Sequence, residues 1–328
     1  WQMTMTSKIF KLTNASEFLT NFFEEINQCT LEYVEFFLKI RQFLDLPNDK
    51  VTQDSQLNSL TGFFNSIIGQ DLSLDMEDLQ QLMIYACIFC FSQDVPIDMR
   101  HQMEIKIREM YECRTIPTDL SIFDFYYNPS SKAWIPLKNH PLAVKSTTRG
   151  SVLLHNHLKQ EIIARIMVKN LISVDIQADS GVGKSTMLRN LLETFNTMDF
   201  LGVAIPSCKG TTLSKITNSI LNCIQQDQSE NGGNSSRQPV SVSRNVLFCI
   251  DDVDQSDQKL SQFIKFFTEH STWLSQNGVV RYSNQVLATT RRKSKEAGKT
   301  PFNSVRINID PIDSQELTNI FKTSLKEK

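Results

Sequence analysis

The feature that most constrains the fold of this chain is the segment at residues 178–186, which reads Ala-Asp-Ser-Gly-Val-Gly-Lys-Ser-Thr. An apolar run at residues 171–176 precedes it, and apolar residues at helical spacing follow it. A strand, a glycine-rich turn and a helix in this order are typical of a loop that binds phosphate groups. The glycines let backbone N–H groups face phosphate oxygens, and the helix N-terminus adds a favourable dipole. The segment therefore predicts an α/β domain that binds a nucleotide.

This loop supplies most of the binding residues that we predict. Lys184 is expected to reach the β- and γ-phosphates, and the hydroxyl of Ser185 is expected to ligate Mg²⁺. The predicted cofactors are ATP or ADP and Mg²⁺. The predicted nucleotide contacts of the loop are Ser180, Gly181, Val182, Gly183, Lys184, Ser185 and Thr186.

A second motif consists of the apolar run at residues 246–250 followed by Asp251 and Asp252. A buried strand that ends in a carboxylate can deliver that carboxylate to a Mg²⁺ ion. We therefore predict Asp251 as the second Mg²⁺ ligand. Asp252 is the predicted catalytic residue, because its carboxylate could orient or deprotonate the attacking water.

A third motif, Val-Leu-Ala-Thr-Thr-Arg at residues 286–291, ends in Arg291. A guanidinium grips phosphate oxygens with two parallel hydrogen bonds, so Arg291 is predicted to lie beside the γ-phosphate. The alternative is an ordinary basic loop, because Arg292, Lys293 and Lys295 follow.

The chain divides into regions of different periodicity. Short apolar runs alternate with helical patterns over residues 146–310, which predicts a three-layer α/β P-loop NTPase fold with a parallel sheet. Residues 1–115 have helical spacing throughout and predict an all-α helical bundle for signalling or interaction. Residues 116–145 are predicted to be a linker packed on the α/β domain, because Trp134 and Leu137 favour burial. Residues 311–328 are predicted to begin a truncated helical subdomain.

Composition narrows the class of protein. The formal net charge is −2, so the chain lacks the basic surplus of a nucleic-acid-binding protein. The seven cysteines are irregularly spaced, which is typical of reduced thiols and indicates a cytoplasmic protein. The apolar run at residues 82–91 is shorter than the about 20 residues of a transmembrane helix. Because Trp1 opens the chain and a helical pattern closes it, we expect a fragment of a longer protein.

Together, the loop at residues 178–186, Asp-Asp-Val at 251–253 and Thr-Thr-Arg at 289–291 resemble the NB-ARC domain of the STAND P-loop NTPases. That family includes the animal apoptosome scaffolds, the nematode cell-death activator and the plant NB-LRR resistance proteins. The resemblance covers residues 146–328. It also assigns a contact with adenosine to Arg149, which ends a Thr-Thr-Arg tripeptide before the first helix.

The resemblance implies a conformational switch between ATP- and ADP-bound states, with at most slow, regulatory ATPase activity. Such a switch would oligomerise on activation in programmed cell death or innate immune signalling. Its N-terminal helices would then present themselves to a downstream signalling protein. The alternative is an AAA+-type ATPase with steady turnover, of the origin-recognition or remodelling kind. Most AAA+ proteins differ from this chain in having Asp-Glu at the second motif and Asn at the end of the third.

Overall fold

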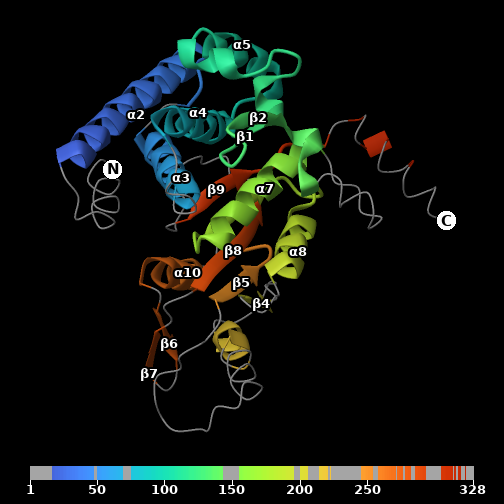
Figure 1. The fold of residues 1–328 in the computed structure, drawn as a ribbon. Coiled ribbons are helices and arrows are strands. Elements are labelled where there is room, and N and C mark those ends of the chain that lie inside the picture. The colour runs from blue at the N-terminus through green and yellow to red at the C-terminus, as the bar shows by residue number, and fades with distance from the viewer. Residues whose placement is uncertain are drawn as a thin grey trace. The chain divides into compact units, whose positions relative to one another are not determined.

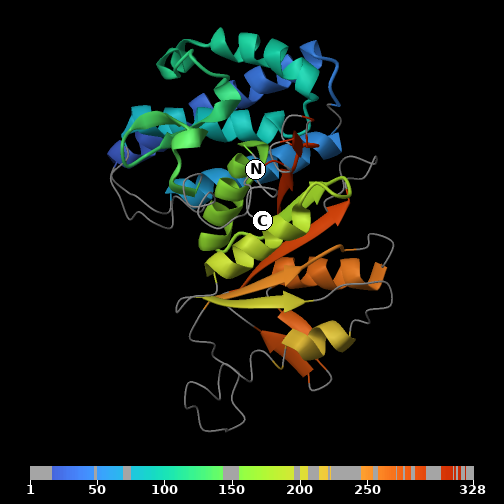
Figure 2. The same ribbon diagram turned by 90° about the vertical axis from the view of Figure 1, so that its right-hand side faces the viewer.

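The computed structural model describes the chain in segments (Figures 1 and 2). The described residues are 17–47, 50–68, 75–142, 155–195, 200–205, 214–220, 222, 245–253, 258–270, 272–275, 278–281, 285–292, 304–312, 314, 317–318 and 322. They form two compact units. One unit is helical and comprises residues 1–162 and 312–328, and the other is an α/β unit of residues 163–311.

The helical unit is built around one buried helix. Its four main helices are α2 (Glu17–Phe43), α3 (Lys50–Ile68), α4 (Met76–Ser92) and α5 (Ile97–Arg108). A capping box between Asp75 and Asp78 begins α4 and satisfies two backbone N–H groups. Every residue from Leu79 to Phe91 except Gln80 is buried, which is typical of a helix surrounded by others. These helices agree with the predicted bundle.

A small hairpin packs on α4. It consists of β1 (Phe125–Asn128) and β2 (Ala133–Pro136), between short 3₁₀ helices at Tyr111–Thr115, Ile122–Asp124 and Leu137–Asn139. The hydroxyl of Tyr127 donates a 2.7 Å hydrogen bond to Asp78, and Nε1 of Trp134 donates a 2.9 Å bond to Gln81. The segment at residues 116–142 thus forms a hairpin on α4, and its predicted packing on the α/β domain stays a prediction. Trp134 is buried as expected, but α4 supplies the buried polar partners for the segment.

The α/β unit contains a five-stranded sheet in which all neighbouring strands are parallel. Its strands are β3 (Val174–Ala178), β4 (Phe200–Ile205), β5 (Asn245–Ile250), β8 (Gln285–Arg292) and β9 (Val305–Asn308). The order across the sheet is β4-β5-β8-β3-β9. The predicted α/β fold with a parallel sheet is thus confirmed. A second hairpin, β6 (Thr272–Ser275) with β7 (Gly278–Arg281), precedes β8 and was not predicted.

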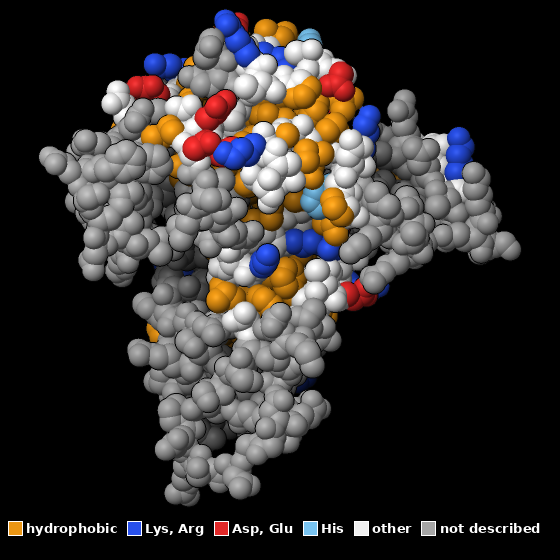
Figure 3. All heavy atoms as spheres, in the orientation of Figure 1, with side chains coloured by type: hydrophobic (Ala, Val, Ile, Leu, Met, Phe, Trp, Pro, Cys, Tyr) orange, Lys and Arg blue, Asp and Glu red, His pale blue; other side chains and the backbone are white. Residues whose placement is uncertain are grey.

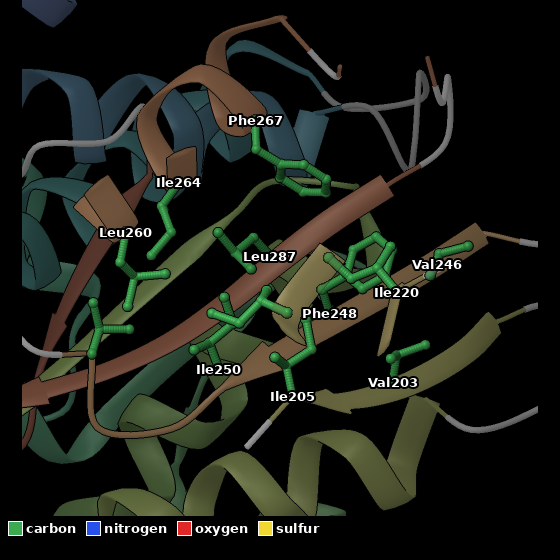
Figure 4. Packing of buried hydrophobic residues seen from close by; sticks show 12 residues of the cluster. Val203, Ile205, Ile220, Val246, Phe248, Ile250, Leu260, Ile264, Phe267 and Leu287 are labelled. Atoms are coloured by element: carbon green, nitrogen blue, oxygen red, sulfur yellow. The ribbon is translucent and has the colours of Figure 1, made fainter. Parts of the chain in front are cut away.

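Helices cover both faces of this sheet. Phe248 and Leu287 pack with residues of α10 (Gln258–His270), and we call this side the α10 face (Figure 4). Side chains of alternate parity point the other way. There Phe195 of α8 (Lys184–Phe195) contacts Phe200, and we call this side the α8 face. The helix α7 (His155–Lys169) precedes β3 in the chain.

The surface of the described residues is mixed. In Figure 3, hydrophobic side chains lie among Lys, Arg, Asp and Glu. The large exposed hydrophobic residues of the helical unit include Phe43, Ile97 and Ile105. Within the described residues, no helix has both the length and the apolar character needed to cross a membrane.

Candidate nucleotide-binding site

The turn between β3 and α8, residues 179–183, is here called the glycine loop. Gly181 has φ 82° and Gly183 has φ 101°, in the region that favours glycine. A Cβ at Gly181 would meet nothing within 4 Å. Glycine is therefore favoured at this position by the backbone conformation, and lack of space is not the reason. The helix α8 starts directly afterwards, and the N–H of Met187 donates to the carbonyl of Gly183 at 3.0 Å. The first N–H groups of α8 thus have no partner within the helix and are available to an anion.

The predicted loop residues lie around this turn. Ser180 and Gly181 are exposed, Val182 is buried and Gly183 is half-buried. Ser185 and Thr186 are exposed in the first turn of α8.

Lys184 lies inside the loop. It is 7% exposed, and its Nζ donates to the carbonyl of Ala178 at 3.1 Å and to that of Asp179 at 2.7 Å. The ammonium group is therefore held by carbonyls of the turn at the N-terminus of α8. Phosphate oxygens placed at this helix end would be within the influence of that charge.

Asp251 and Asp252 directly follow β5, in a turn fixed by Thr290. The Thr290 hydroxyl donates to Oδ1 of Asp251 and accepts a 2.8 Å hydrogen bond from the N–H of Asp252. The carbonyl of Thr290 accepts a 2.8 Å bond from the N–H of Val253. Asp251 is half-buried, and Asp252 is exposed with φ 49°. Thr290 thus orients the carboxylate that was predicted to bind Mg²⁺.

The sheet order brings the loop and the carboxylate to one edge. Since β8 lies between β3 and β5 and all three are parallel, their carboxyl ends meet there. The register pairs Ile176 with Thr290 and Cys249 with Ala288. Ala178, Thr290 and Asp251 therefore share the α8 face, the side on which the glycine loop enters its helix.

The structure does not bring Arg291 to this site. Successive residues of a strand point to opposite faces, so Arg291 lies on the α10 face while Thr290 lies on the α8 face. Arg291 is 3% exposed and forms an ion pair with Asp175. The predicted contact between Arg291 and the γ-phosphate is therefore not made in this arrangement. Arg149 lies outside the described residues.

Thr290 is the residue that the sequence reasoning missed. It belongs to the Thr-Thr-Arg motif, but Arg291 was predicted instead because arginine commonly binds phosphate. A strand that ends in a hydroxyl beside an acidic turn is the signal that could have identified it.

A thiol lies next to the carboxylate without adding reactivity. Burial, and to a smaller extent the nearby Asp251 carboxylate, raises the pKa of the Cys249 thiol to about 12. Cys249 therefore stays protonated at neutral pH and is not a nucleophile or a metal ligand.

The residues at this edge fit a magnesium nucleotide. They supply a lysine ammonium, helix N-terminal N–H groups, the hydroxyl of Ser185 and the carboxylate of Asp251. No cluster of three or more His, Cys, Asp or Glu that could hold a metal ion occurs in the described segments. A Mg²⁺ ion here would take its remaining ligands from phosphate and water, as this ion commonly does.

Two comparisons with known proteins address the family. Residues 19–139 match the model of the dynein heavy chain AAA lid domain. The chain is also 23% identical over 186 residues to the mouse protein dynein axonemal heavy chain 17. It resembles dynein heavy chains. That alignment covers 53% of this chain and 4% of the mouse protein.

These matches point to the AAA+ ATPases and overturn the NB-ARC resemblance. The lid match covers most of the helical bundle that was predicted to serve in signalling or interaction. The roles in cell death and immunity depended on the NB-ARC resemblance and lose their support. The resemblance rested on three short motifs, and in one of them the arginine forms an ion pair on the opposite face of the sheet.

Proposed function

We propose that this chain is a nucleotide-binding segment of an AAA+-type ATPase related to dynein heavy chains. In this proposal ATP and Mg²⁺ bind at the carboxyl edge of the sheet, and the helical unit is a lid domain. The observation that carries the proposal is the convergence of three elements on the α8 face. These are the glycine loop with Lys184, the hydroxyl of Thr290 and the carboxylate of Asp251.

Each element has a distinct task in the proposal. The N–H groups of the glycine loop and of the start of α8 would bind phosphate oxygens, and Lys184 would add a positive charge. Ser185 and Asp251 would hold Mg²⁺, which when bound neutralises negative charge on the phosphates. Asp252 would orient or deprotonate the attacking water.

The position of Asp252 supports slow hydrolysis. Its N–H is bound to Thr290, and its backbone φ is 49°, so the start of its side chain is fixed. The side chain of aspartate is one methylene shorter than the glutamate of most AAA+ proteins. We therefore expect the Asp252 carboxylate to approach the attacking water less closely than a glutamate would, and the turnover to be low.

The test combines ATP binding with phosphate release. Lys184→Ala is expected to weaken ATP binding by at least about tenfold, because a charge-assisted contact is lost. Asp252→Asn is expected to keep the ATP affinity and to lower turnover by about 100-fold or more. Calorimetry with ATP and Mg²⁺ and a steady-state phosphate assay measure the two effects.

Lys215→Ala is the matched control, because Lys215 is an exposed lysine of the same α/β unit. It should change neither binding nor turnover. An unchanged ATP affinity in Lys184→Ala would refute the proposed site.

A further inference from the structure

A charged pair lies inside the α/β unit, away from the glycine loop. Asp175 in β3 is 0% exposed and Arg291 in β8 is 3% exposed, and they form an ion pair on the α10 face. The carboxylate of Asp175 also accepts hydrogen bonds from Thr289 Oγ1 at 2.9 Å and from Gln177 Nε2 at 2.7 Å. Both of its oxygens are thus bound by side chains from the two strands.

A parallel sheet does not in general require a buried ion pair. Buried parallel strands are usually continuous apolar runs. A buried ion pair must overcome the loss of hydration of two charges, and well-packed apolar residues of similar volume are often as stable. Such a pair gives geometric definition, because a charged group without its partner is strongly disfavoured in the interior.

The pair is attached to the residue that orients Asp251. Arg291 directly follows Thr290, and the two side chains leave the strand on opposite faces. Fixing the guanidinium on the α10 face fixes the backbone from which Thr290 projects on the α8 face. Thr290 in turn holds Asp251 and the two N–H groups that follow it.

The turn at residues 251–253 depends on those bonds. Asp252 has a positive φ, a conformation that disfavours residues with a Cβ, although aspartate tolerates it better than most. The hydrogen bonds from Asp252 and Val253 to Thr290 support this conformation, together with the bond from the N–H of Asp252 to Oδ1 of Asp251. Movement of Thr290 would therefore release the carboxylate of Asp251.

We propose that Asp175 and Arg291 are positioning residues for the metal site, because they hold Thr290 and through it the Asp251 carboxylate. This inference rests on the proposed function. The two residues touch neither nucleotide nor ion. Their loss should raise the Mg²⁺ concentration needed for tight ATP binding and should leave the Mg²⁺-independent affinity of the glycine loop unchanged.

The test is a Mg²⁺ titration of ATP binding in the whole chain. The double variant Asp175→Leu/Arg291→Met removes both charges and keeps apolar volume. It is expected to raise the half-saturating Mg²⁺ concentration by about fivefold or more, since the aspartate ligand loses its fixed orientation. ATP affinity in EDTA is expected to stay within about twofold of the native value, because the glycine loop is intact.

Three further variants complete the test. Thr290→Val should raise the Mg²⁺ requirement at least as much as the double variant. Arg291→Lys keeps the positive charge but loses the planar guanidinium with its paired donors. Its half-saturating Mg²⁺ concentration should therefore lie between those of the native protein and the double variant. Arg41→Met/Asp94→Leu removes an ion pair of the helical unit, in which Arg41 is buried and Asp94 is partly exposed, and should leave the Mg²⁺ titration unchanged.

The outcomes separate this inference from the proposed function. The positioning role alone would be overturned if Thr290→Val shifts the half-saturating Mg²⁺ concentration while Arg291→Lys and the double variant leave it at the native value. If the double variant does not fold, an Arg291→Lys titration identical to the native one overturns it. Failure of the native protein to bind ATP would overturn both.

Discussion

Gly183 carries the strictest backbone requirement of the glycine loop. Gly183 has a φ of 101° and immediately precedes Lys184, the first residue of α8. In Gly183→Ala, the Cβ disfavours this conformation by about 1–2 kcal/mol or more. Relief of this strain would rotate the peptide groups that we propose to bind the phosphates. We expect a loss of ATP affinity of at least about tenfold and a destabilised α/β unit.

Calorimetry and denaturant unfolding measure these two effects. Gly202→Ala in β4 is the control, because the positive-φ glycines among the described residues are Gly181 and Gly183. The control variant should bind ATP normally. Native affinity in Gly183→Ala would show that the loop conformation does not matter for binding.

At the residue scale, the sequence indicated which residues lie at the site better than it indicated the sheet face to which each side chain points. The loop residues and Asp251 lie at one sheet edge, as their motifs indicated. Which of Thr290 and Arg291 lies beside Asp251 could not be predicted from spacing. The face of each side chain depends on the register of β8 with β3 and β5, and a shift of one residue reverses every direction.

At the element scale, a charge network attaches the β1–β2 hairpin to α4. Lys132 lies 2.6 Å from both Asp75 and Asp78. The hydrogen bond from Lys132, followed by that from the backbone of Asp78, lowers the pKa of Asp75 from 3.8 to about 2. A depressed carboxyl pKa stabilises the folded state above the unfolded pKa. That contribution is lost as the pH falls from about 4 towards 2.

We therefore predict that Lys132→Met reduces the pH dependence of stability between pH 4 and pH 2. Without Lys132, the pKa of Asp75 moves back towards its ordinary value and the folded state gains less from its ionisation. Denaturant unfolding, followed by the fluorescence of Trp134 with Trp1 and Trp273 replaced by Phe, measures this dependence. Lys138→Met, at an exposed lysine after the hairpin, should keep the native pH profile. An identical profile in Lys132→Met would contradict the network.

Elements with strong periodicity were predictable, and short ones were not. The predicted apolar runs at residues 246–250 and 286–291 agree closely with β5 and β8. The strands β1 and β2 have only four residues each, too few for a clear alternation. Burial of Trp134 was predicted, but its partner Gln81 is distant in the sequence, so its contact with α4 could not be predicted.

At the scale of the whole molecule, family assignment required more than the nucleotide motifs. A glycine loop and an acidic strand end occur in many nucleotide-binding proteins because phosphate and Mg²⁺ impose the same requirements on each. The discriminating match lies in the helical unit, at residues 19–139. Its apolar spacing is that of any helical bundle, so periodicity alone indicated a fold class and no family.

The proposed site also predicts where nucleotide stabilises the molecule. All of its described residues belong to the unit of residues 163–311. At an ATP concentration about 100 times the Kd, binding stabilises the folded unit by about 2.7 kcal/mol. Amides of β3, β5 and β8 that exchange through unfolding of this unit should then exchange about 100-fold more slowly. Amides of α4, in the other unit, should be much less affected.

Hydrogen exchange with mass spectrometry, with and without ATP and Mg²⁺, measures both regions in one sample. Lys184→Ala at the same nucleotide concentration is the control, and its β3 amides should lose most of the protection. Equal protection of α4 and β3 would mean that the two units open together. ATP binding would then raise the free energy of unfolding of both units together, and the α/β unit could not be treated as a separate binding domain.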